Sequence, residues 1–492
     1  MTYHIAVDIG ASSGRLILAD VQDGKWQLQE IHRFKNGFTR VDQHDRWDIE
    51  ELFHQILVGL EKAKELGVDN CTLGIDTWAV DYVLLKDGKA LAQPIAYRDK
   101  RTEKVMEKVF QKLPAKNIYE KTGIQFLNFN TLFQYASEDP QLLEEADTSL
   151  LIPDYLAYRL TGRQVAEVSN ASTTQLLNIH HRDYDYDLLD LAGIKASQLP
   201  DLVETGTYLG PLLRENFKDY KLPYVEVYAV ATHDTALGVP ATSKDFAYIS
   251  SGTWSLIGVE LTSPIVTKES QEANYTNEWG AYQTYRFLKN ITGMWTVQEI
   301  ARCLDYQYSY AEMAEQASQV APFEQYVNLN DERFTNPEQM IQEIQAYCRE
   351  TGQKVPETVG ELTMCVYSNL ALIYGAEWKR LEKLTGKSFE VLHIVGGGSN
   401  VALLNQLTAN VIQKPVIAGP GEGTAIGNLL VQLIASGTFS NLGEARAFLK
   451  EEISLKEFFP DFTIETDHLK IFHTALFFRF DLRYNFLILL SF

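Results

Sequence analysis

The 492-residue sequence has few of the features that mark secreted, membrane-spanning or nucleic-acid-binding proteins. It has four cysteines, too few for a disulfide framework and without the spacing of zinc ligands. It has no run of 18 uncharged apolar residues and no signal peptide at its start. Lys and Arg total 44 against 65 Asp and Glu, a formal net charge of −21, which argues against nucleic acid or an anionic membrane as partner. We therefore expect a cytoplasmic protein with neither partner.

Common short catalytic signatures are missing as well. The sequence has no Walker phosphate loop, dinucleotide-binding fingerprint, HExxH zinc motif, nucleophile elbow or EF-hand loop. The pair Cys348 and Cys365 leaves two interpretations open, a bridge or two buried free thiols, and we expect buried thiols. The length exceeds that of one hydrophobic core, so at least two domains are expected.

The hydrophobic pattern predicts alternating strands and helices. Strands are expected at 5–7, 16–18, 26–31 and 72–75, with an amphipathic helix over 49–66, which together indicate a mixed sheet. A second strand–polar turn–strand pattern follows at 246–259, about half the chain later, and indicates two related halves. Further elements are a helix over 361–384, strands at 391–395 and 416–418, and helices starting near residue 400 and ending at 433.

The first candidate site is Asp8 with the small polar turn that follows it. A carboxylate at a strand end can hold hydrated Mg²⁺, and the N–H and hydroxyl groups of such a turn can donate to phosphate oxygens. Gly10 and Gly14 would let the backbone approach the phosphates. The alternative is an ordinary hairpin with Asp8 as a turn former.

The second candidate is His233-Asp234-Thr235, which follows a strand expected over 224–230. An Asp there can accept the proton of a substrate hydroxyl and orient it for attack on phosphorus. The alternative is that Asp234 or Thr232 caps a helix, with His233 a structural histidine.

Two further segments combine polar groups with aromatic or glycine residues. Asp76 and Asp81 flank Trp78, a combination suited to a polyol, although a half-buried strand end with solvated aspartates is the alternative. The glycines at 396–398 lie between a strand and a helix, and their lack of side chains would let a diphosphate lie against the backbone. Asn400 could pair with a base edge or cap the helix that follows, and we expect it to cap the helix.

Taken together and in order, these segments closely resemble the FGGY family of carbohydrate kinases, and within it a branch that phosphorylates L-rhamnulose. The resemblance covers residues from about 4 to about 460. It rests on segments 7–15, 74–78, 96–99, 153–155, 159–162, 173–176, 233–235, 250–255 and 393–398.

The resemblance implies an α/β fold of two duplicated actin-like ATPase (ribonuclease H-like) domains that flank a catalytic cleft and close over ATP and sugar. It implies an N-terminal domain over 1–243, a C-terminal domain over 244–460 and an atypical apolar tail over 461–492. The implied reaction transfers the γ-phosphoryl group of ATP, with Mg²⁺, to the 1-hydroxyl of L-rhamnulose. Another ketose or polyol kinase of the family (fuculose, xylulose) and a non-enzymatic actin-like ATP-binding scaffold are the alternatives. We expect a monomer or homodimer.

The resemblance also implies roles for individual residues. Asp234 would be the general base, and Asp8 would hold Mg²⁺ through water. At position 79 relatives often carry Gly, so the methyl of Ala79 would reshape the sugar pocket. The residues implied to contact ATP are Ala11, Ser12, Ser13, Gly14, Arg15, Thr253, Gln298 and Gly397, and those implied to contact the sugar are Ala79, His233, Asp234, Thr235 and Asn290.

Overall fold

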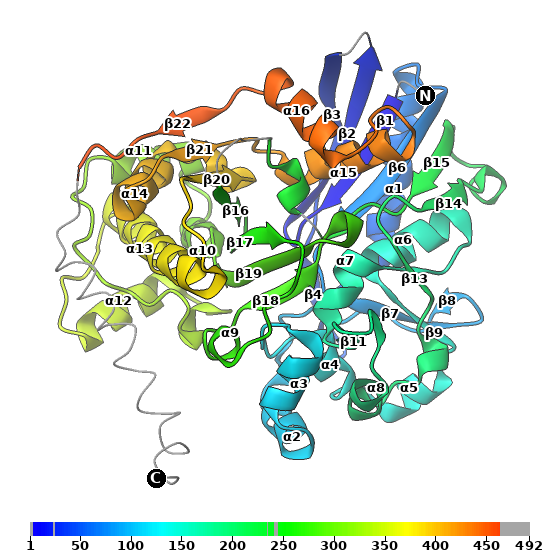
Figure 1. Cartoon of the computed structure of the whole chain (residues 1–492), viewed down its shortest axis with the longest axis horizontal. Helices are drawn as coiled ribbons and strands as arrows, with labels where there is room; N and C mark the ends of the chain where they lie inside the picture. Colours follow the sequence, from blue (N-terminus) through cyan, green and yellow to red (C-terminus); the bar gives the residue numbers. More distant parts are fainter. Residues whose placement is uncertain (1–2, 23–24, 234, 241–244, 463–492) are drawn as a thin grey trace. The chain divides into compact units, whose positions relative to one another are not determined.

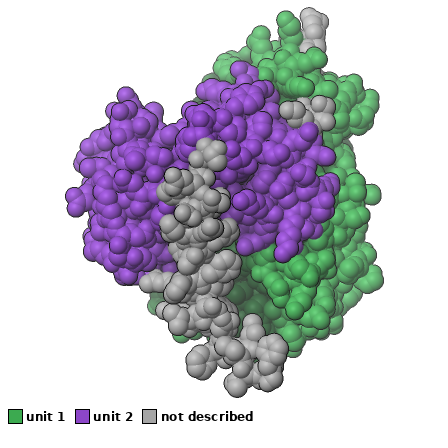
Figure 2. Space-filling view, turned by 60° about the vertical axis from the view of Figure 1, so that its left-hand side comes forward, with its two compact units in different colours: residues 1–241, 259–289, 422–453 green, residues 242–258, 290–421, 454–492 purple. Residues whose placement is uncertain are grey.

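The computed structural model describes residues 3–22, 25–233, 235–240 and 245–462. The chain folds into two compact units, coloured separately in Figure 2. The first comprises residues 1–241, 259–289 and 422–453, and the second comprises 242–258, 290–421 and 454–492. The expected boundaries at 243 and 460 remain predictions. Asp234 and most of the expected apolar tail lie outside the described residues.

The first unit is built on a six-stranded sheet in the order β14-β15-β6-β1-β2-β3 (Figure 1). Strands β1 and β2 form an antiparallel hairpin, whereas β6 and β15 run parallel to β1 and to each other. The mixed sheet expected from the sequence is therefore confirmed. The strands are β1 (Tyr3–Ile9), β2 (Ser13–Gln22), β3 (Lys25–Lys35), β6 (Asn70–Thr77), β14 (Tyr208–Pro211) and β15 (Tyr224–Tyr228).

Helix α1 (Ile49–Glu65) forms because its apolar residues recur on one face and its ends are capped. The Asp48 side chain accepts from the Glu51 N–H at the N-terminus, and lysines occupy the last turn, where they suit the helix dipole. Its apolar face, including Ile56 and Leu60, packs in the core with β1 and β6 residues such as Val7 and Leu73.

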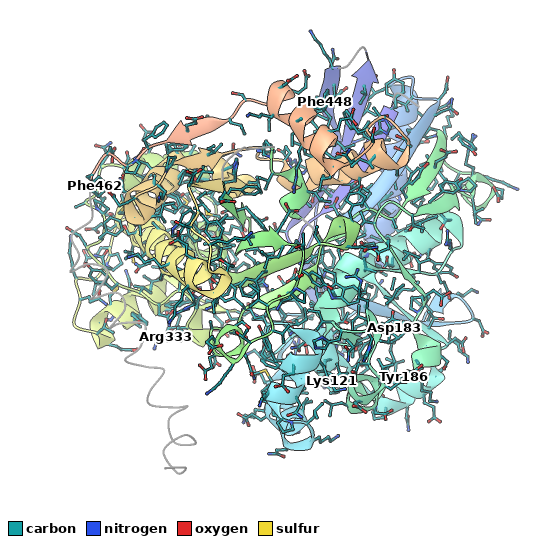
Figure 3. All side chains as sticks on the ribbon, in the orientation of Figure 1. Lys121, Asp183, Tyr186, Arg333, Phe448 and Phe462 are labelled. Carbon is teal, nitrogen blue, oxygen red and sulfur yellow. The ribbon has the colours of Figure 1, made fainter. Side chains whose placement is uncertain are left out.

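Helix α15 (Gly423–Ala435) comes from the far end of the sequence and packs against β1 and β6 (Figure 1). Its Asn428 donates to Asp76 at 2.6 Å, and its Gln432 donates to the Ile5 carbonyl at 2.9 Å. Helix α16 (Leu442–Glu452) follows, and its Phe448 (Figure 3) packs edge-on against Trp26 with ring centroids 5.5 Å apart.

The first unit also contains a second core, which includes Phe133, Leu151 and Leu189. The remaining helices of this unit are α2 (Val105–Lys112), α3 (Ala115–Thr122), α4 (Thr131–Tyr135), α5 (Pro140–Glu145), α6 (Ile152–Thr161), α7 (Val168–Ala171), α8 (Tyr186–Ala192) and α9 (Lys268–Glu272). Its remaining strands are β4 (Phe38–Val41), β5 (His44–Trp47), β7 (Tyr82–Lys86), β8 (Lys89–Ala90), β9 (Thr148–Leu151), β10 (Ala166–Glu167), β11 (Leu177–Asn178), β12 (Asp183–Tyr184), β13 (Leu202–Val203), β18 (Thr276–Trp279) and β19 (Tyr285–Thr292).

The second unit contains consecutive strands in the order β17-β16-β20-β21-β22. Strand β16 (Phe246–Ser251) pairs antiparallel with β17 (Trp254–Leu261) and parallel with β20 (Val391–Val395), as β1 does with β2 and β6. The other elements are α10 (Trp295–Cys303), α11 (Tyr310–Ala317), α12 (Met340–Glu350), α13 (Val359–Thr385), α14 (Ala402–Ile412), β21 (Val416–Ala418) and β22 (Lys456–Phe458).

Two further expectations from the sequence can be compared with the described residues of the structure. Cys348 and Cys365 are both buried free thiols, as expected. Across the described ranges, no helix combines the length and the apolar character that crossing a bilayer needs.

Candidate active site

Asp8 and Arg15 face each other across the hairpin of β1 and β2. The two residues are paired in register, and Arg15 donates to Asp8 Oδ2 from Nε at 3.0 Å and from Nη2 at 2.7 Å. Arg15 also forms an ion pair with Glu422, just before α15. In this structure the guanidinium implied to contact ATP is thus held by two carboxylates of its own unit.

Asp76 is the neighbour of Asp8 on the other side, because β1 and β6 pair in parallel register there. It is 1% exposed, and its Oδ2 accepts from Asn428 at 2.6 Å. Burial raises the pKa of Asp76 well above its ordinary value, and the adjacent Asp8 carboxylate raises it further. Asp76 is buried, so the alternative of a solvated aspartate is wrong here.

The turn between β1 and β2 comprises residues 10–12. The Gly10 N–H donates to the Ser13 carbonyl at 2.9 Å, and Asn36 holds the turn by donating to the Gly10 and Ser12 carbonyls at 2.8 and 3.1 Å. Ser12 is exposed. A Cβ at position 14 would lie 2.2 Å from the Phe34 ring, so packing against Phe34 is a sufficient reason for glycine there.

Asp81 organises the loop that carries Ala79. Its two carboxylate oxygens accept from the indole N–H groups of Trp47 and Trp78 at 2.6 and 2.9 Å, from the Gln134 amide at 2.9 Å and from the Tyr97 N–H at 3.1 Å. Burial outweighs these bonds and raises the pKa of Asp81 to about 6. Asp81, 1% exposed, is thus committed to protein donors rather than solvated.

Val80 marks strain in the same loop. Its φ is +72°, a conformation that a β-branched residue rarely adopts. The Val80 carbonyl accepts from the Thr131 hydroxyl at 2.7 Å and the Gln134 amide at 3.3 Å, which fix the peptide. A strained backbone conformation persists only where neighbouring contacts fix it, and such conformations are typical of functional loops. Ala79, adjacent to it, is half-buried.

The segment before Asp234 is anchored by a buried carboxylate. The Thr232 hydroxyl donates to Glu167 at 3.0 Å. The Nε2 atom of His233 lies 3.9 Å from an oxygen of Glu278, and the His233 side chain is 20% exposed. Asp234 itself lies outside the described residues, and Thr235 begins the short 3-10 helix η5 (Thr235–Gly238).

In the second unit, the turn between β16 and β17 contacts the start of α10. The Met294 N–H donates to the Gly252 carbonyl at 2.9 Å, and the Trp295 N–H donates to the Thr253 carbonyl at 3.2 Å. The Thr253 hydroxyl donates to Gln298 at 3.4 Å, so two residues implied to contact ATP touch each other. Asn290, implied to contact the sugar, lies half-buried in β19.

The three glycines after β20 have different surroundings. Gly396 has a φ of +83°, and a Cβ at position 398 would lie 2.0 Å from Ser251 Oγ. A Cβ at position 397 would meet nothing within 4 Å. Gly397, the one implied to contact ATP, is thus the glycine of the three whose side-chain position faces open space. The expected cap at Asn400 is wrong, because α14 begins after Val401 without a side-chain cap.

The predicted ATP residues thus form two groups, residues 11–15 in the first unit and Thr253, Gln298 and Gly397 in the second. No set of three or more His, Cys, Asp or Glu side chains among the described residues is arranged to hold a metal ion. A surface hollow of about 620 Å³ beside β14, lined by residues such as Arg214 and Tyr220, contains none of the predicted site residues.

Sequence reasoning missed three buried polar residues close to these positions. Glu167 contacts Thr232, Asp154 accepts from the Glu167 N–H at 3.3 Å, and Asn428 contacts Asp76. Glu167 and Asn428 lie 65 and 352 positions from the candidates they contact, so no local pattern links them to the site. Asp154 lies in a segment that carries the family resemblance, but its contact to Glu167 could not be read from the sequence.

Comparison with known proteins identifies the family. The profiles of the N-terminal and C-terminal domains of the FGGY family of carbohydrate kinases match residues 3–239 and 247–436. A protein named rhamnulokinase from Ligilactobacillus salivarius is 53% identical over 94% of this chain and 96% of its own length. Another of that name, from Lactiplantibacillus plantarum, is 50% identical over 97% of this chain and 98% of its own length.

A solved structure agrees with the fold. The ligand-bound xylulose kinase from Lactobacillus acidophilus superposes with a TM-score of 0.75 at 16% identity, and the match covers 98% of each chain. The expected two-domain α/β fold with mixed sheets is confirmed. The chain belongs to the FGGY family of carbohydrate kinases.

Proposed function

We propose that this kinase transfers the γ-phosphoryl group of ATP to the 1-hydroxyl of L-rhamnulose, giving L-rhamnulose 1-phosphate and ADP. The observation that carries this is the shared name of the two relatives above, which are at least 50% identical to it and match at least 94% of its length. The xylulose kinase is only 16% identical and supports the fold alone.

Asp234 is the proposed general base. Its carboxylate takes the proton of the sugar 1-hydroxyl as that oxygen attacks the γ-phosphorus, and the bond from the γ-phosphorus to the bridging oxygen breaks, so that ADP leaves with the electron pair. Support comes from its neighbours: Thr232 and His233 are fixed by side-chain and backbone bonds, so Asp234 follows an anchored segment.

The proposed contacts to ATP come from two turns. Gly397 borders open space, and Thr253 and Gln298 contact each other beside the turn between β16 and β17. The other group, residues 11–15, comprises part of the turn after β1 and the first residues of β2: Ala11, Ser12, Ser13, Gly14 and Arg15. Small residues at both places let phosphate oxygens approach backbone N–H groups.

Mg²⁺ is proposed to bind near Asp8 through water. A single carboxylate, with one oxygen held by Arg15, fits an ion that keeps most of its waters and takes its other ligands from phosphates. The absence of a three-residue metal cage among the described side chains agrees with that type of site. When bound, the ion neutralises charge on the phosphates.

The sugar is proposed to contact His233, Thr235 and Asn290, with Ala79 on the loop that Asp81 organises. The fixed indole of Trp78 and the strained peptide at Val80 support the idea that this loop has a defined shape.

The test is an ADP-release assay across L-rhamnulose, L-fuculose and xylulose. We expect the highest kcat/KM with L-rhamnulose, and Asp234→Asn should lower kcat by roughly 10²–10⁴-fold. Nucleotide binding, measured by calorimetry, should persist in that variant. A preference for another sugar would contradict the substrate, and a fully active Asp234→Asn would contradict the base.

A further inference from the structure

Glu167 is a buried carboxylate surrounded by hydrogen-bond donors. It is 0% exposed, and it lies at the end of β10, before α7. Its Oε1 accepts from the Thr205 hydroxyl at 2.7 Å. Its Oε2 accepts from the Ser169 hydroxyl at 2.5 Å and from the Asn170 N–H at 3.4 Å. Burying such a group is costly unless its oxygens are satisfied, and donors reach both of them.

The same oxygen holds the segment that leads to the proposed base. Glu167 Oε2 accepts from the Thr232 hydroxyl at 3.0 Å and from the Thr232 N–H at 3.2 Å. The Ser169 hydroxyl, which donates to Glu167, accepts from the His233 N–H at 3.4 Å. Both residues directly before Asp234 are therefore tied to this one carboxylate.

Thr232 is held from its other side as well. Its carbonyl accepts from the Thr77 N–H at 3.1 Å, at the end of β6. The peptide groups on both sides of Thr232 are thus fixed, one by the sheet and one by Glu167. The direction in which the chain continues from Thr232 to His233 depends on both.

The neighbouring Asp154 is buried as well. Burial raises the pKa of Asp154 well above its ordinary value, and the Glu167 carboxylate adds to that effect. Burial raises the pKa of Glu167 as well, and the hydrogen bonds from Ser169, Thr205 and Thr232 act in the opposite direction.

We infer that Glu167 is a positioning residue for phosphoryl transfer: it fixes Thr232 and His233 so that the carboxylate of Asp234 meets the sugar hydroxyl. The role rests on the proposed function of Asp234. Misplacing a reacting group by about 1 Å can cost on the order of 10²-fold in rate.

The test compares two threonines bound to the same carboxylate. Thr232→Val and Thr205→Val each remove one buried hydroxyl from Glu167 with little change in shape, but only Thr232 precedes the base. We expect Thr232→Val to lower kcat about 10-fold and Glu167→Ala about 10²-fold, with KM for ATP unchanged. Thr205→Val should stay within about twofold of the parent kcat, and Glu167→Gln should retain more activity than Glu167→Ala.

A second readout does not depend on turnover. In the nucleotide-free protein, hydrogen exchange at the Thr232 and His233 amides should accelerate in Glu167→Ala and not in Thr205→Val. Equal kcat values for the two threonine variants, or unchanged exchange in Glu167→Ala, would overturn the inference. A parent protein without activity on any ketose would instead contradict the proposed function, and the exchange result would still decide whether Glu167 holds this segment.

Discussion

Gly397 and Gly398 allow a matched test of the glycine turn after β20. A methyl at position 398 would lie 2.0 Å from Ser251 Oγ and 2.5 Å from Ser251 Cβ, whereas one at 397 would meet nothing within 4 Å. Ser251 is 1% exposed, so it has little room to move. Overpacking costs about 1–3 kcal/mol, and these distances put Gly398→Ala near the upper end. Gly397→Ala should cost little stability.

Urea unfolding followed by circular dichroism measures the difference. With an m-value of about 3 kcal/mol/M, a loss of about 3 kcal/mol lowers the midpoint by about 1 M. Ser251→Gly removes both clashing atoms, so the double variant Gly398→Ala/Ser251→Gly should regain part of the loss. Gly397→Ala should keep the midpoint and raise KM for ATP, because its methyl enters the space proposed for the nucleotide. Equal midpoints for the two alanine variants would refute the packing argument.

Two further predictions concern the first unit. The pKa of about 6 for Asp81 lies above that of an unfolded aspartate, so the Asp81 contribution to the unfolding free energy falls by roughly 3 kcal/mol as the pH rises from about 3 to about 7. Asp81→Asn should flatten that part of the stability–pH curve, and an unchanged slope would contradict the assignment. Gly14→Ala places a methyl 2.2 Å from the Phe34 ring and should lower the free energy of unfolding by about 1–3 kcal/mol. The double variant Gly14→Ala/Phe34→Leu should recover part of that loss in urea unfolding. An unchanged free energy of unfolding in Gly14→Ala would show that the ring can move aside.

The regular elements were the predictable part of the fold. Strands β20 and β21 have the predicted bounds, and the helix predicted over 361–384 is α13 (Val359–Thr385). These segments have continuous apolar patterns or a capping box, Thr358 with Glu361, that act locally. The β4–β5 hairpin was missed, because its strands have four residues each and most of them are exposed or half-buried.

The site was less predictable, because its organisation depends on contacts between distant residues. Three identical glycines stand at positions 396–398 of the sequence, and the structure separates them by the positive φ of Gly396 and by the contact of position 398 with Ser251. The Thr232 hydroxyl, a helix cap in the alternative interpretation, donates to Glu167, 65 positions earlier. Asp76 is buried rather than solvated because β1 and α15 enclose it. The role of Asp234 stays a prediction.

The position of α15 has a consequence for how the protein is made. Its apolar face, with Ile426, Leu429 and Leu430, covers residues of β1 and β2 such as Ala6 and Ile17. The ribosome synthesises those strands more than 400 residues before it reaches the helix. Until the helix emerges, the nascent sheet presents an uncovered apolar face, the kind of surface that chaperones bind. A fragment that stops before the helix should therefore aggregate, and supplying α15 as a separate peptide should improve its solubility.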